Sequence, residues 1–126
     1  MIIRLFLASV LGAAIGYQRE REQRPAGLRT HMLICLGATI FTLIDIFGFG
    51  EASQERIAAG IVTGIGFLGA GAILHRQGGI IVGLTTAASI WATAGIGIAV
   101  GVGLYVLAIV ATAITLLILL LPHPIR

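Results

Sequence analysis

The sequence predicts an all-α membrane protein, a polytopic bundle of about five transmembrane helices that forms a single domain over residues 1–126. Composition is the first reason: 58% of the residues are hydrophobic and only 10% are charged, whereas soluble domains carry about 25% charged residues. So little polar surface could not coat a water-soluble globule. The second reason is that the apolar residues form four long regions, separated by charged or glycine-rich breaks.

Five helices follow from these four regions, because the last region is too long for one span. It covers residues 80–121 without a charge and would measure about 63 Å as one helix, against about 30 Å of hydrocarbon. It must bend back, and glycines mark the place: Gly95, Gly97, Gly101 and Gly103. The expected helices cover approximately residues 2–17, 28–49, 57–74, 80–98 and 102–121.

The arginines predict the orientation. With five spans, six of the eight arginines fall on one side: Arg19, Arg21, Arg24, Arg29, Arg76 and Arg126. Only Arg4 and Arg56 fall on the other. Because basic residues stay on the cytoplasmic side, the N-terminus is expected outside and the C-terminus in the cytoplasm. The arginines form no continuous stripe, so no nucleic-acid partner is expected although the pI is near 10.

The first loop carries a charged motif made of Arg19, Glu20, Arg24 and Arg29. Glu20 precedes Arg24 by four residues, so the two can pair if the helix continues. Arg24 and Arg29 flank a Pro-Ala-Gly turn, and guanidinium groups suit phosphate or carboxylate. Two interpretations stay open: an anchor for an anion or for the loop, and a plain positive-inside signal.

Five residues of the second helix share about 120° of arc at 100° per residue: His31, Cys35, Thr39, Thr42 and Asp45. Ionisable groups within a membrane usually face a bundle interior or a water-filled path. Asp45 is therefore the most informative residue, either a functional group or a group near the outer interface that is hydrated or paired with Arg56. His31 is expected at the cytoplasmic edge, as an interfacial residue rather than a metal ligand.

The fourth helix carries a second polar stripe: Thr85, Thr86, Ser89 and Thr93. Its hydroxyls can line a path, or they can hydrogen-bond between helices, which is the commoner role. Trp91 lies on the opposite side, where it would face lipid or a partner subunit.

The third helix contains a literal G-x-G-x-x-G from Gly64 to Gly69. A dinucleotide site needs a strand before this pattern and an acid after it; here no Asp or Glu follows, so that function is excluded. Two glycine faces instead predict close packing against neighbours on both sides, as in the central helix of a bundle. The packing residues are Gly60, Gly64 and Gly71 on one face, and Gly66 and Gly69 on the other.

No set of catalytic residues stands out, and one Cys with three scattered His residues makes no zinc cluster. We therefore expect neither enzymatic activity nor a cofactor. Magnesium prefers oxygen ligands, and the candidate metal ligands are Asp45, Glu51 and Glu55, all on the predicted outer side.

Three blocks together resemble the membrane domain of the MgtC/SapB family. They are Ile15-Gly16-x-x-Arg-Glu with Arg24-Pro-Ala-Gly-Leu-Arg-Thr-His, then Arg56-Ile-Ala-Ala with Gly64-Ile-Gly-Phe-Leu-Gly-Ala-Gly, and Gly83-Leu-Thr-Thr-Ala-Ala-Ser-Ile-Trp-Ala-Thr-Ala-Gly95. The resemblance covers residues 4–105. Many members carry a soluble C-terminal domain after this membrane domain. Three positions depart from the expected pattern: Gln18 replaces Glu, Gly60 replaces Gln, and Val82 replaces a basic residue.

The resemblance implies a bacterial inner-membrane protein involved in growth under magnesium limitation or survival inside host cells. It favours a regulator that acts through membrane protein partners. The alternative is a transporter of Mg²⁺ or a small solute, with a path lined by the second and fourth helices. The expected partners are the lipid bilayer and a second copy of the chain, with a dimer favoured.

Overall fold

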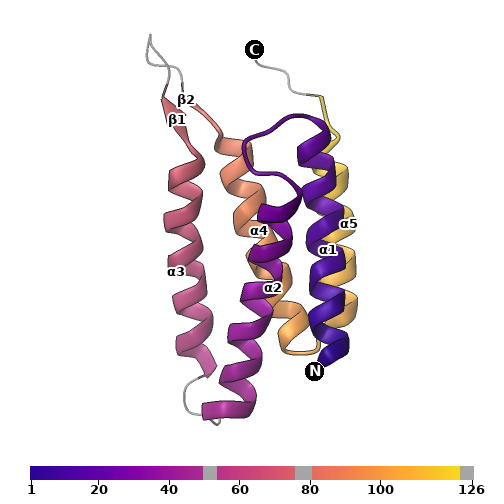
Figure 1. Cartoon of the computed structure of the whole chain (residues 1–126), viewed down its shortest axis with the longest axis vertical. Coiled ribbons are helices and arrows are strands. Elements are labelled where there is room, and N and C mark those ends of the chain that lie inside the picture. The colour runs from indigo at the N-terminus through magenta and orange to yellow at the C-terminus, as the bar shows by residue number, and fades with distance from the viewer. Residues whose placement is uncertain (50–53, 76–80, 123–126) are drawn as a thin grey trace.

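A computed structural model of the chain describes residues 1–49, 54–75 and 81–122, which form a bundle of five α-helices (Figure 1). The α-helices are α1 (Ile2–Arg21), α2 (Leu28–Ile44), α3 (Gln54–Ala72), α4 (Leu84–Gly101) and α5 (Tyr105–Leu119). The π-helix η1 (Asp45–Phe49) extends α2, and the two-residue strands β1 (Leu74–His75) and β2 (Ile81–Val82) pair antiparallel between α3 and α4.

Among the described residues, three helices are long and apolar enough to cross a membrane: Ile2–Arg21, Leu28–Gly48 and Leu84–Gly101. Arg56–Ala72 and Tyr105–Leu119 are shorter apolar helices. These five helices agree with the predicted all-α transmembrane bundle of about five helices.

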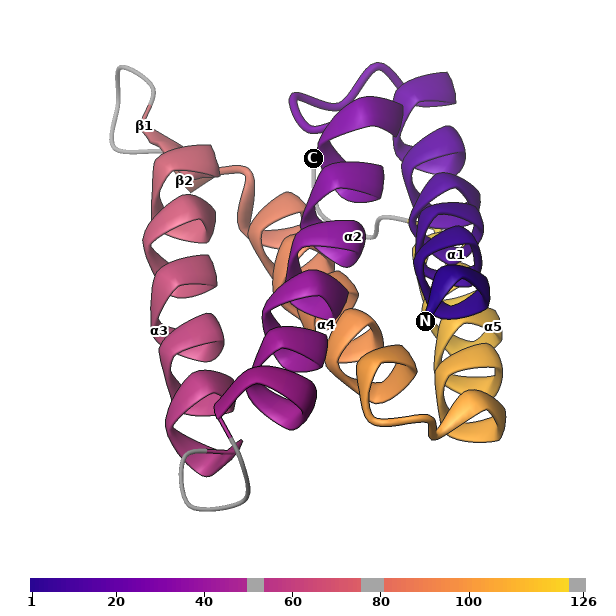
Figure 2. The same cartoon turned by 60° about the horizontal axis from the view of Figure 1, so that its bottom comes forward.

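The centre of the bundle is α4, which contacts each of the other four α-helices. Figure 2 shows α3 on one side of α2 and α4, and α1 with α5 on the other side. One apolar cluster joins α1, α2, α4 and α5 around Ile15 and Val100. A second joins α2, α3 and α4 around Ile34 and Ile90.

The bend in the long apolar region lies at Val102–Leu104, later than its first two glycines suggested. Gly95 and Gly97 lie inside α4, whereas Gly103 adopts a left-handed conformation with φ of +88°, which glycine adopts without steric cost. Arg4 donates hydrogen bonds to the Gly101 carbonyl (2.8 Å) and the Tyr105 hydroxyl (2.9 Å). The first turn of α1 is thereby fastened to this bend.

The expectation that the third helix is central was wrong, because α3 lies at the edge of the bundle (Figure 2). A Cβ added at Gly60, Gly64, Gly66 or Gly71 would meet nothing within 4 Å, and at Gly69 it would make only ordinary contact with Ala87. The predicted close packing of these glycines is therefore not formed within the described part of the chain.

Other glycines bring helices together. A Cβ at Gly12 or Gly16 of α1 would lie 2.7 Å from backbone atoms of α2, and one at Gly97 of α4 would lie 2.5 Å from the Cys35 carbonyl oxygen. Such distances are too short for real side chains. Contacts of this kind let α1, α2 and α4 approach closely enough to exchange the polar contacts described below.

Candidate functional site

A buried arginine joins α1 to α4. Arg19 is 2% exposed, and its Nη2 donates a 2.7 Å hydrogen bond to the Thr86 hydroxyl. Its Nε is also buried and has no hydrogen-bond partner among the described residues. Because a buried charge is costly unless it is well paired, Thr86 provides an important part of the compensation.

Sequence reasoning placed Arg19 in a cytoplasmic loop, but α1 continues past residue 17 to Arg21. The buried residues of α1 recur at helical spacing: Ala8, Leu11, Gly12, Ile15, Gly16 and Arg19. Arg19 is thus the last member of the buried stripe of this helix. The same spacing, extended by one turn, would have identified it from the sequence.

A buried histidine joins α2 to α4 beside this contact. His31 lies in the first turn of α2 and is fully buried within the protein, and its position at the cytoplasmic edge of the membrane stays a prediction. Its Nδ1 lies 2.9 Å from the Gly27 carbonyl, which can only accept, so Nδ1 carries the proton. The Nε2 lies 2.9 Å from Ser89 Oγ, which also lies 2.8 Å from the Thr86 carbonyl. In the neutral ring, the Ser89 proton therefore has two acceptors.

The other residues of the polar stripe predicted from His31 to Asp45 also lie in the interior: Cys35, Thr39, Thr42 and Asp45 are all buried. The Thr39 hydroxyl shares its proton between the Cys35 carbonyl (3.0 Å) and the Gly97 carbonyl (2.8 Å). The Thr42 hydroxyl donates to the Ala38 carbonyl of its own helix. The hydroxyl groups of this stripe are therefore bonded to backbone carbonyls.

Only part of the polar stripe predicted on α4 is buried. Thr86, Ser89 and Thr93 are buried, and Thr93 donates back to the Ser89 carbonyl. Thr85 is exposed, so it does not belong to the buried set. Trp91, on the opposite face, is 60% exposed.

Asp45 lies at the other end of α2, in the first turn of η1, and is 2% exposed. It lines a cavity of about 270 Å³ together with residues of α2, α3 and α4, among them Thr42, Ile57 and Ile98. Of the other candidate metal ligands, Glu51 and the side chain of Glu55 lie outside the described residues. Within the described residues, no group of three His, Cys, Asp or Glu side chains could hold a metal ion.

The charged motif of the first loop is arranged differently from the prediction. Because α1 ends at Arg21, Arg24 pairs with Glu22 at 3.6 Å instead of with Glu20. Glu20 accepts a 3.1 Å hydrogen bond from the Leu28 N–H at the start of α2. Arg24 and Arg29 are both exposed.

Gln18 contributes a contact that sequence reasoning missed. Its amide nitrogen donates to Glu22 (2.8 Å) and to the Leu119 carbonyl at the end of α5 (3.4 Å). A glutamate, which the family pattern led us to expect, could not donate to that carbonyl when ionised. The side chain of Val82, another departure from the pattern, lies outside the described residues, whereas Gly60 lines an open groove.

Comparison with known proteins gives a consistent result. The MgtC family model matches residues 5–126. Over 103 residues, the chain is 48% identical to the Escherichia coli K12 protein named "Putative magnesium transporter YhiD", covering 75% of this chain and 47% of that protein. Over 95 residues it is 50% identical to the Salmonella typhimurium protein named "Protein MgtC", covering 75% of this chain and 40% of that protein.

A Haemophilus influenzae protein without a functional name is 42% identical over 102 residues, covering 74% of this chain and 43% of that protein. The chain thus spans less than half the length of these curated relatives. No solved structure matches it. The match along almost the whole sequence and the identities to these relatives show that the chain belongs to the MgtC family.

Proposed function

We propose that the chain is a multi-pass protein of the bacterial inner membrane, with its N-terminus outside and its C-terminus in the cytoplasm. The apolar helices support the membrane location, and the arginine distribution supports the orientation. The relatives come from bacteria, and one carries a magnesium-related name.

Within this membrane, the proposed role is that of a regulator that acts through membrane protein partners during magnesium limitation or survival inside host cells. One observation carries the choice of a regulator over a transporter. The hydroxyls of Thr39, Thr42 and Thr93 are engaged by backbone carbonyls. A hydrated cation needs polar groups that are free to face it, and hydroxyls bound in this way suit helix packing better than conduction.

The alternative, a transporter of Mg²⁺ or a small solute, is favoured by Asp45. This residue is a buried acid beside a cavity bordered by Thr42 of α2 and Ile98 of α4. Acids within a membrane often mark an ion path, and the E. coli relative is named for magnesium transport. Neither role requires a catalytic group or a cofactor.

Reconstitution of the purified chain into liposomes that enclose a Mg²⁺-sensitive dye separates the two roles. The regulator predicts no Mg²⁺ uptake above that of empty liposomes. It also predicts that the tagged chain, expressed at native level in magnesium-limited cells, crosslinks reproducibly to another membrane protein. Uptake that disappears in Asp45→Asn would overturn the regulator in favour of the transporter.

A further inference from the structure

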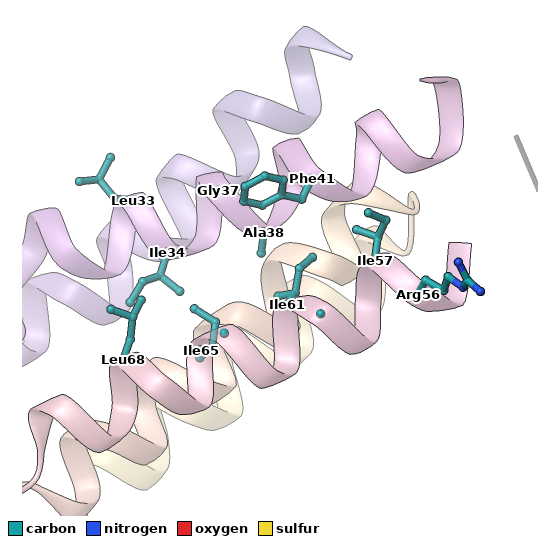
Figure 3. A pocket seen from close by; sticks show the side chains of 12 residues that line it. Leu33, Ile34, Gly37, Ala38, Phe41, Arg56, Ile57, Ile61, Ile65 and Leu68 are labelled. Atoms are coloured by element: carbon teal, nitrogen blue, oxygen red, sulfur yellow. The ribbon is translucent and has the colours of Figure 1, made fainter. Parts of the chain in front are cut away.

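An apolar groove runs between α2 and α3 (Figure 3). It encloses about 560 Å³ and is lined by Leu33, Ile34, Gly37, Ala38, Phe41, Arg56, Ile57, Gly60, Ile61, Gly64, Ile65 and Leu68. A second hollow of about 460 Å³ shares Leu33, Ile34 and Leu68 with it and extends toward Pro25 and Gly71. The two hollows adjoin at these shared residues, and we call them together the α2–α3 groove.

Glycines, which have no side chain, leave this groove open. A Cβ added at Gly37, Gly60 or Gly64 would meet nothing within 4 Å. Large apolar side chains at its margin remain exposed: Leu33 by 66%, Phe41 by 56% and Leu68 by 54%. An unfilled hollow forfeits the dispersion contacts of its lining, so within a membrane this groove favours an apolar occupant.

One end of the groove is charged. Arg56, in the first turn of α3, is the only charged residue among the described residues that line the groove, and Figure 3 places it at one end of the row of apolar side chains. It is exposed and forms no hydrogen bond or ion pair with another described residue. A guanidinium group binds phosphate through two parallel hydrogen bonds.

We propose that the α2–α3 groove binds an anionic phospholipid of the membrane, with the lipid phosphate on Arg56 and an acyl chain along Gly60, Gly64 and Leu68. The groove has one cation at the end of a long apolar depression. Such a lipid has an anionic headgroup at the end of an apolar chain, so the lipid and the groove are complementary in charge and in polarity. Arg56 also lies where the apolar part of α3 begins, which is the level at which lipid headgroups are found.

A second copy of the chain is a poorer occupant. A two-fold contact places the same surface on both partners. Two copies that met through this groove in a membrane would set hollow against hollow and bring Arg56 near Arg56. Both the shape and the charge oppose that arrangement, whereas a lipid complements both.

Native mass spectrometry of the purified chain, titrated with phosphatidylglycerol or with phosphatidylethanolamine, tests the proposal. Phosphatidylglycerol should bind more tightly. Arg56→Gln removes the guanidinium group at an exposed position, and its phosphatidylglycerol binding should be weaker by about tenfold or more, because each lost charge-assisted hydrogen bond corresponds to at least about tenfold in affinity. Gly64→Leu fills the middle of the groove and should weaken binding of both lipids.

Two variants are matched controls. Gly66→Leu makes the same change on the same helix, at an open position that does not line the groove. Arg21→Gln removes the same charge at an exposed position at the end of α1. Both should bind lipid like the unmodified chain, and circular dichroism should show equal helix content in all four variants.

Equal binding of the two lipids, or wild-type binding by Arg56→Gln, would overturn the proposal. It would also fail if Gly64→Leu and Gly66→Leu weakened binding equally. A change in the oligomer mass of Gly64→Leu without a loss of bound lipid would identify a second copy as the occupant and likewise refute it.

Discussion

Arg19 and Thr86 lie 67 residues apart in the chain, yet the guanidinium group of one donates a 2.7 Å hydrogen bond to the hydroxyl of the other. Both side chains are 2% exposed. The contact joins the end of α1 to the first turn of α4, so the charge of a conspicuous sequence motif lies inside the bundle. It also gives the most direct test of how the bundle is held together.

Thr86→Val should destabilise the fold. Valine has nearly the same shape, but it leaves Arg19 without its hydroxyl partner, at a cost of about 1–2 kcal/mol. The measurement is thermal unfolding in detergent. Thr85→Val is the control, because Thr85 is exposed on the same helix and its substitution should change the stability little.

A double substitution sharpens this test. Replacing both partners in Arg19→Met/Thr86→Val removes the buried charge together with its acceptor, so the double variant should be more stable than Thr86→Val alone. Additive losses from the two single changes would contradict a direct interaction.

Gly97→Ala should destabilise the bundle, whereas Gly64→Ala should not. A Cβ added at position 97 would lie 2.5 Å from a backbone oxygen of α2, but one added at position 64 would meet nothing within 4 Å. Overpacking costs on the order of 1–3 kcal/mol, while alanine at an open helical site gains up to about 1 kcal/mol in helix propensity. The same unfolding measurement applies, and equal stability of the two variants would argue against the close approach of α2 and α4.

Gln23→Cys in a Cys35→Ala background should report the orientation. Position 23 is exposed in the loop between α1 and α2, and Cys35 is buried. If this loop is cytoplasmic, as the arginine bias predicts, a membrane-impermeant thiol reagent should label it only after the cells are opened. Rapid labelling of intact cells would reverse the proposed orientation.

Asp45→Asn should abolish complementation of a magnesium-limited growth defect while leaving the fold intact. The amide is nearly isosteric with the carboxyl group, so the change replaces the acid on the buried cavity wall without altering the shape of the wall. Growth complementation, measured beside thermal stability, distinguishes the two effects. Normal growth of the variant would remove Asp45 from the functional site, and a large loss of stability would assign it a structural role instead.

The helices could be predicted from the sequence because burial in a membrane depends mainly on runs of apolar residues. The 42-residue apolar region at 80–121 had to contain two helices, and α4 and α5 occupy it. The inward face of α2 followed from the helical spacing of His31 and Thr39. Both predictions depend only on the length of an apolar region and on the spacing of its polar residues, and both can be determined from a single sequence.

The position of α3 could not be predicted for a physical reason. Glycine in a helix permits either a close neighbour or an empty hollow, and its sequence pattern is the same in both cases. Gly97 permits a close neighbour, whereas Gly64 leaves an empty hollow. The interior position of Arg19 was missed for a different reason: its charge suggested a loop, although its spacing from Ile15 matched the buried face of α1.

The central position of α4 also bears on the order in which the chain is made. Arg19 bonds to Thr86, His31 to Ser89, and Thr39 to the Gly97 carbonyl, so three buried polar groups of α1 and α2 find partners on α4. A ribosome synthesises about 60 further residues after these groups before their partners emerge. Until then, the nascent helices must keep an arginine and a histidine hydrated or sheltered by the insertion machinery, and a chain cut short before residue 84 would expose them to membrane quality control.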